Sequence, residues 1–259
     1  MIIRTIKRIF KWIIISITVQ TVILAYINYV YLPGTRRVKT TIYEYYEPSK
    51  NSWRLKIPKS SSKIRASFNG RYVGYMRDGK LIVQDAANGN KKIVVGPDDG
   101  KLTYFKWLPD RGIIIYSLSL LQNGYCDIQI ATYNAESGEK RIYPDISGLP
   151  EGSEVDEIKL YILTNTVYVK VKTGKSCSQI YRFDIMDNCT LMMTANSDIL
   201  IEQTVHNDNL VYENNGNIYV RSGSSNVEKQ LKFGRKSVLL GIDSMDRVFA
   251  GQQDQDGKI

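Results

Sequence analysis

Residues 81–89, LIVQDAANG, set the pattern of the fold, because similar stretches return further along the chain. The copies are IATYNAESG at 130–138, IYRFDIMDN at 180–188 and, more loosely, IYVRS at 218–222. Each is a short β-rich run that leads into Asn, Asp, Ser or Gly, as a strand leads into a hairpin turn. The matching polar residues, spaced by 49, 50 and 38 positions, are Asp85, Asn134, Asp184 and Ser222.

A repeat of about 40–50 residues that contains several short strands is typical of a β-propeller blade. One such sheet cannot bury both of its faces alone, whereas a stack of sheets around an axis can. The repeated polar residue suits the turn from the third strand of a blade into the fourth, because its side chain can bond to nearby backbone. We therefore expect an all-β propeller domain over residues 42–259.

The two ends of this region predict how the ring is completed. Asp256–Ile259 repeats Asp78–Leu81, so the chain stops where a third strand should begin. Residues 42–46 and 53–57 resemble a third and a fourth strand without their first two. We expect about five blades, four in sequence and one shared between residues 42–57 and 236–259, because closure removes exposed strand edges. A fragment of a larger propeller would also stop in mid-blade, so that alternative stays open.

Most of the net charge of +9 lies in the N-terminal segment. Of 35 basic residues in the chain, seven lie before residue 40 and the first acidic residue is Glu44. The other 28 basic residues nearly balance the 26 acidic ones. A nearly neutral domain lacks the broad basic surface of a nucleic-acid binder. We therefore expect no nucleic-acid partner.

Residues 12–32 form a run of 21 residues without a formal charge. A helix of that length spans roughly 30 Å, the thickness of the hydrocarbon core of a bilayer. The alternatives are a buried core helix or a cleavable signal peptide, but the latter has a shorter apolar stretch and a small-residue cleavage site. We expect one transmembrane signal-anchor helix at residues 12–32, which contacts the lipid bilayer.

The flanking charges orient this expected helix. A basic tail at residues 1–11 precedes it, and a linker at residues 33–41 follows it. The small excess of basic charge before the helix favours a cytoplasmic N-terminus. The C-terminal domain is then expected outside the cytoplasm, at the cell membrane.

The sequence also resembles a known repeat family. Residues 66–75 with Asp78–Leu81, and residues 105–110 with 113–116, are similar to the repeats of TolB-like and dipeptidyl-peptidase N-terminal (WD40-like) β-propellers. That family has a Ser-Pro-Asp-Gly type of turn between the first two strands of a blade. This chain keeps Pro109-Asp110 in one blade and has Phe68-Asn69-Gly70 in another. The resemblance implies a protein- or ligand-binding scaffold, sometimes attached to a peptidase.

No catalytic constellation is visible in the sequence. His206 is the only histidine and lies in a turn-like HNDN stretch, and no Gly-x-Ser-x-Gly motif occurs. We expect no catalytic residue, no cofactor and no metal site. The three cysteines, Cys126, Cys177 and Cys189, are expected to be buried free thiols rather than a disulfide framework.

Two functions remain at this point. The first is a membrane-anchored, extracytoplasmic binding module for a protein, a peptide or an envelope component, and not an enzyme. The second is the regulatory propeller of a peptidase-like enzyme, either truncated or paired with a separate catalytic partner. Aromatic side chains are the usual anchors of a binding surface. The candidates for ligand contact are Tyr45, Tyr46, Trp53, Tyr104 and Trp107.

Overall fold

The computed structural model describes residues 2–27, 55–161, 163–225, 227–234 and 236–252. The chain divides into two compact units, Met1–Ser52 and Trp53–Ile259. In the described part of the first unit, the regular element is the helix α1 (Ile2–Tyr26). The second unit contains the strands.

The helix α1 begins at Ile2, ten residues before its expected start at Trp12. No Gly or Pro interrupts residues 2–11, so no local helix breaker keeps this basic segment apart from the helix. The described part of the basic segment is therefore continuous with the helix. Among the described residues, no helix is both long and apolar enough to cross a membrane. Residues 28–32 of the expected span and the expected linker at 33–41 lie outside the described residues.

The second unit is made of β-strands and one short 3-10 helix, η2 (Pro97–Asp99). In chain order the strands are β1 (Ser62–Ala66), β2 (Tyr72–Arg77), β3 (Lys80–Asp85), β4 (Lys91–Val95), β5 (Lys101–Trp107), β6 (Ile113–Gln122), β7 (Tyr125–Asn134), β8 (Lys140–Ile142), β9 (Ile146–Pro150), β10 (Glu154–Tyr161), β11 (Thr166–Lys172), β12 (Cys177–Phe183), β13 (Cys189–Asn196), β14 (Ile201–Gln203), β15 (Asn209–Asn214), β16 (Asn217–Ser222), β17 (Glu228–Gln230), β18 (Ser237–Ile242) and β19 (Val248–Gln252).

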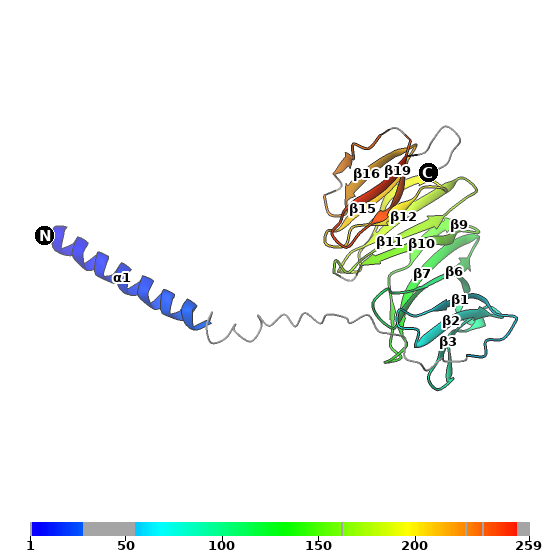
Figure 1. Ribbon diagram of the computed structural model, residues 1–259. Helices are drawn as coiled ribbons and strands as arrows, with labels where there is room; N and C mark the ends of the chain where they lie inside the picture. Colours follow the sequence, from blue (N-terminus) through cyan, green and yellow to red (C-terminus); the bar gives the residue numbers. More distant parts are fainter. Residues whose placement is uncertain (1, 28–54, 162, 226, 235, 253–259) are drawn as a thin grey trace. The chain divides into compact units, whose positions relative to one another are not determined.

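These strands form successive antiparallel sheets that resemble propeller blades. Sheet 1 is β1–β4, sheet 2 is β5–β8, sheet 3 is β10–β13 and sheet 4 is β14–β17, while β18 pairs with β19. In sheet 2, β9 pairs with the first part of β7 and adds a fifth strand. The sheets follow one another in chain order, from cyan β1–β3 through green and yellow to red β19 (Figure 1). This arrangement confirms the expectation of an all-β domain made of repeated four-stranded units.

The four repeated stretches fall at the same place in each sheet. They end the third strands β3, β7, β12 and β16. Their shared polar residue accepts a hydrogen bond from backbone N–H groups of the following turn, which confirms its expected role. The bonds run from Ala87 N to Asp85 Oδ1 (2.8 Å), from Glu136 N to Asn134 Oδ1 (2.9 Å), from Met186 N to Asp184 Oδ1 (2.8 Å) and from Ser225 N to Ser222 Oγ (3.3 Å).

The hydrophobic core lies between neighbouring sheets. The central strands of a sheet bury side chains on both of their faces. Ile114 packs in the cluster between sheets 1 and 2, while its neighbour Ile115 packs in the cluster between sheets 2 and 3. Two further clusters join sheet 3 to sheet 4 and sheet 4 to β18–β19. Successive side chains of a strand point to opposite faces. This explains why the central strands read as continuous apolar runs such as Ile113–Tyr116 rather than as alternating ones.

The first strands of neighbouring sheets lie next to one another. Contacts run from β1 to β5, from β5 to β10, from β10 to β14 and from β14 to β18. We call the face formed by this row of strands the first-strand side. Within the described residues, β19 pairs with β18 alone. Residues 55–57 of the expected N-terminal strand pair have no strand structure, and residues 42–54 and 253–259 lie outside the described part of the chain.

Candidate functional site

The expected contact aromatics divide into two groups. Tyr45, Tyr46 and Trp53 lie outside the described residues. Trp107 is buried, donates its Nε1–H to the carbonyl oxygen of Arg65 at 2.9 Å and stacks on Tyr72 with ring centroids 6.3 Å apart. These contacts place its indole in the packing between sheets 1 and 2.

Tyr104 is half-buried on β5 and packs against the cluster between sheets 2 and 3. Burial raises the pKa of its phenol. The next residue on the same face of β5 is Lys106, two positions along. Of the expected aromatics that the structure describes, Tyr104 is therefore the one on the same strand face as Lys106, which lines a polar cavity.

This cavity has a volume of about 260 Å³ and lies on the first-strand side. Its wall comes from three neighbouring sheets, with Lys106 from β5, Lys159 and Tyr161 from β10 and Glu202 from β14. Leu108 and Ile158 are among the apolar residues that complete the wall. At this cavity, polar side chains of three different sheets meet on the first-strand side.

An ion-pair network forms the polar part of the cavity wall. The Lys159 ammonium lies 2.7 Å from Glu157 Oε1 and 2.8 Å from Glu202 Oε1, and its side chain is only 13% exposed. Burial lowers the pKa of Lys159, but the hydrogen bonds to the two carboxylates outweigh burial and raise it above its ordinary value. Lys159 therefore stays charged and joins β14 to β10.

Lys106 has a different environment, although it lines the same cavity. It is half-buried, and its ammonium makes no hydrogen bond or ion pair with the residues that the structure describes. Burial, followed by the nearby charge of Lys159, lowers its pKa below the ordinary value. The cavity thus combines one fully paired lysine with one unpaired lysine.

The sequence reading missed Lys106, Lys159 and Glu202. A signal was available, because each is a charged residue within a β-rich run, as in Phe105-Lys106-Trp107 and Ile158-Lys159-Leu160. A charged residue between two large apolar residues of a strand lies on the face opposite to both of them. The sequence pattern does not show which charged residues of other sheets lie close to each of these residues.

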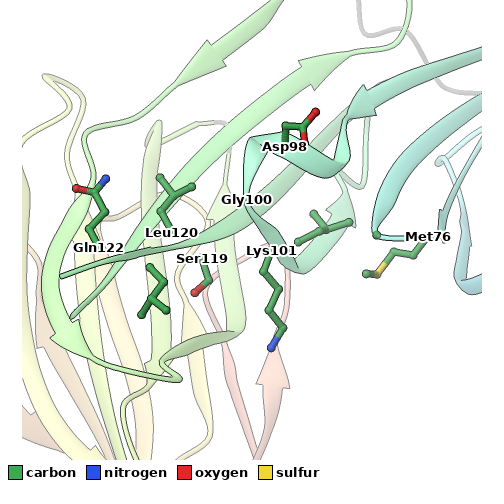
Figure 2. Close-up of a pocket in the computed structure, with 10 residues that line it drawn as sticks. Met76, Asp98, Gly100, Lys101, Ser119, Leu120 and Gln122 are labelled. Atoms are coloured by element: carbon green, nitrogen blue, oxygen red, sulfur yellow. The ribbon is translucent and has the colours of Figure 1, made fainter. Parts of the chain in front are cut away.

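A second cavity, of about 770 Å³, lies between sheets 1 and 2. Figure 2 shows Leu120 and Gln122 of β6 on one side and Met76 of β2 on the other, with Lys101 and Ser119 between them. The ammonium of Lys101 forms an ion pair with Glu154 of β10. The wall combines apolar side chains such as Leu120 and Met76 with the polar groups of Asp98, Lys101, Ser119 and Gln122.

The structure also places the remaining residues that the sequence singled out. Within the described residues, no group of three or more His, Cys, Asp or Glu side chains is arranged to hold a metal ion. His206 lies in the turn between β14 and β15, with its Nδ1 3.5 Å from Asp246 Oδ2. The three cysteines are free, as expected, but the expectation that all are buried is wrong. Cys126 is buried and Cys177 is half-buried, whereas Cys189 is exposed at the start of β13.

Comparison with known proteins supports the fold. The chain resembles a dipeptidyl peptidase 4 from Porphyromonas gingivalis, with a TM-score of 0.53 and 9% sequence identity over 78% of this chain and 37% of that one. It resembles a prolyl endopeptidase with a TM-score of 0.51 and 15% identity over 71% of this chain and 30% of the other. The β-propeller domain of Cps50 (Swd1) from Myceliophteria thermophila matches with a TM-score of 0.48 and 12% identity, over 78% and 65%.

The first of these matches confirms the expected resemblance to dipeptidyl-peptidase propellers, and the second adds a resemblance to the propeller domain of a prolyl endopeptidase. The chain spans about a third of the length of the two peptidases. No protein-family model matches the sequence. No curated protein matches it either.

Proposed function

We propose that this chain is a binding module that holds a peptide or an extended segment of a protein on its first-strand side. The observation that carries the proposal is the cavity at Lys106, Lys159 and Glu202, where side chains from three sheets converge. The packed sheets keep these side chains in fixed positions, and a rigid scaffold lowers the entropic cost of binding. Tyr161 supplies an aromatic side chain at the same place.

The proposal includes closure of the domain into five blades. Residues before 55 would supply strands beside β18 and β19, which form a sheet of only two strands among the described residues. Closure would remove the unpaired edge of β19. Deleting residues 42–57 should then lower the unfolding temperature of the β domain, whereas an open fragment would show no change.

The cellular location of the chain is proposed from residues 12–32. Residues 12–32 carry no charge, and the apolar side chains of the described residues 12–27 are exposed. We propose that this segment attaches the chain to the cell membrane, with its C-terminal domain outside the cytoplasm. Fractionation after carbonate extraction tests this, because a chain that leaves the membrane in the extract would contradict the proposal.

A second candidate is a propeller that regulates a peptidase-like partner. The resemblance to two peptidases favours it. Glu202 lines the cavity, but Glu202 and Glu157 both bind the Lys159 ammonium, which favours an ion-pair network over general acid–base chemistry. In the regulatory case, the chain should change the rate of a separately encoded peptidase and should not cleave peptides by itself.

The binding proposal is tested by selecting peptides from a random library against the full chain. We expect selected peptides to bind at least tenfold more weakly to Tyr161→Ala, because truncation removes an anchor from the cavity. Tyr125→Ala is the matched control, since Tyr125 is 60% exposed at the start of β7 and away from the cavity. Peptides that bind both variants equally well would place the ligand elsewhere and overturn the proposal.

A further inference from the structure

Lys106 is an ammonium group without a counter-ion in a partly buried position. Two lysines of the neighbouring sheet, one half-buried and one buried, do have acceptors. Lys159 binds Glu157 and Glu202, and Lys170 donates to the carbonyl oxygen of Ile199 at 2.8 Å. Among the described residues, no acceptor is placed on the Lys106 ammonium.

The charges around Lys106 do not provide this acceptor. Glu157 and Glu202 act on it electrostatically, but both already bind Lys159. The positive charges of Lys159 and Arg65 lower the pKa of Lys106 and so disfavour its charged form. Taking a charged group out of water is costly unless it is paired. An added anion would therefore gain a charge-assisted hydrogen bond without displacing an existing partner.

The cavity restricts the kind of anion. Its volume of about 260 Å³ is below the usual range for drug-sized ligands, so it suits a single side chain or a chain terminus. Leu108, Ile115, Ile158 and Leu160 line it beside the two lysines. The occupant therefore needs a small apolar body next to its negative charge.

We propose that the Lys106 ammonium binds a carboxylate of the peptide ligand, with the apolar part of the same residue in the cavity. The inference rests on the binding function proposed above and adds the ligand chemistry. The carboxylate comes either from a C-terminus or from an acidic side chain, and the experiment separates these two sources.

The test uses the full chain with 13C-labelled lysine and three small probes. These are N-acetyl-leucine, N-acetyl-leucinamide and the 1-amide of N-acetyl-glutamic acid. We expect at least one acid to shift the ε-methylene signal of Lys106 and to raise the pKa of this residue, while the leucinamide leaves both unchanged. The acid that binds more tightly identifies the source of the carboxylate.

Substitutions then show whether Lys106 is the receptor. Lys106→Met keeps the aliphatic stem and should weaken acid binding at least tenfold, whereas Lys106→Arg should restore it. Lys91→Met is the control, because Lys91 is exposed on β4 and lines neither cavity. An NMR spectrum of each variant, with the same signal dispersion as the parent chain, shows that the domain is folded.

Two outcomes would overturn the inference. In one, the acids and the amide bind equally well; in the other, Lys106→Met keeps its preference for acids. If library peptides still bind through Tyr161 in either case, the binding function stands and the carboxylate receptor does not. If no library peptide binds but the acids still require Lys106, the anion site stands and the peptide-binding function falls.

Discussion

Arg182 of β12 and Asp208 of the turn before β15 join two neighbouring sheets. The Arg182 guanidinium donates to Asp208 Oδ2, with its Nε at 2.7 Å, and the Tyr168 hydroxyl donates to Oδ1 at 3.1 Å. Burial lowers the pKa of Arg182, but the hydrogen bonds to Asp208 outweigh burial and raise it. Burial, with the charge of Asp208, raises the pKa of Tyr168. One carboxylate thus holds two side chains of sheet 3 against sheet 4.

Asp208→Asn should lower the free energy of unfolding by about 3 kcal/mol. The substitution keeps the shape of the side chain but leaves the little-exposed Arg182 charge without its counter-ion. Urea denaturation measures the change. Asp110→Asn is the control, because Asp110 pairs with its exposed neighbour Arg111 and should change stability by at most about 1 kcal/mol. Equal effects of the two substitutions would contradict the role of Asp208.

Gly223→Ala should damage the same junction. An added Cβ would lie 2.5 Å from Asp208 Oδ2, 2.6 Å from the Tyr168 hydroxyl oxygen and 2.7 Å from Arg182 Nε. These atoms are held by one another, so relief of the overlap must break a hydrogen bond. We expect a loss of about 2 kcal/mol in the free energy of unfolding, measured by denaturation.

Gly174→Ala provides the comparison for this glycine substitution. A Cβ at Gly174 would meet only the Cβ of Cys177, at 3.9 Å, which is ordinary contact. Stability should therefore change by less than about 1 kcal/mol. If Gly223→Ala is as mild as Gly174→Ala, the junction has more room than the structure shows.

The ion pair between Lys159 and Glu202 should show a measurable coupling energy. We expect about 1–2 kcal/mol in a double-mutant cycle of Lys159→Met and Glu202→Gln, because both side chains are mostly shielded from water. The exposed pair of Lys101 and Glu154 should give less than about 1 kcal/mol in the equivalent cycle. A coupling near zero for the first pair would mean that Lys159 is held by packing alone.

Asp156 should make the stability depend on pH in the acid range. Partial burial raises the pKa of its carboxyl group, but Lys170 at 2.8 Å and Lys172 at 2.9 Å outweigh burial and hold it below the ordinary value of 3.8. The unfolded chain then binds the proton more readily than the folded chain. The contribution to stability is therefore complete above the unfolded value and is lost as the pH falls through the lower folded value.

Asp156→Asn should remove this part of the pH dependence. The variant should be less stable than the parent chain at pH 7, and the gap should narrow as the pH falls from about 5 to about 2. Urea denaturation over this range measures it. A gap that stays constant with pH would show that Asp156 acts through its shape and not through its charge.

Local patterns were sufficient to predict the strands and turns. Asp85 and Asn134 bind backbone groups within three residues, so the sequence around each contains the whole motif. At Asp78-Gly79 both residues have a positive φ, 50° and 73°, as a tight hairpin turn requires. The spacing of these motifs then predicted repeated sheets, because each sheet needs a neighbour to cover its faces.

The exposure of Cys189 was predicted incorrectly. Cys189 stands next to apolar residues in the sequence, yet β13 is the last strand of its sheet, and its first three residues are exposed. Burial on such a strand depends on whether another sheet covers it.

The sequence by itself determined the repeated four-stranded units, their turns and the polar residue that closes each third strand. All of these depend on interactions between residues that are close along the chain. Only the tertiary structure decided that Lys159 meets Glu202, 43 positions away, that Arg182 meets Asp208, and that Lys106 faces a cavity without a partner. These relationships depend on the stacking of sheets, and stacking fixes which residues of separate repeats lie opposite one another.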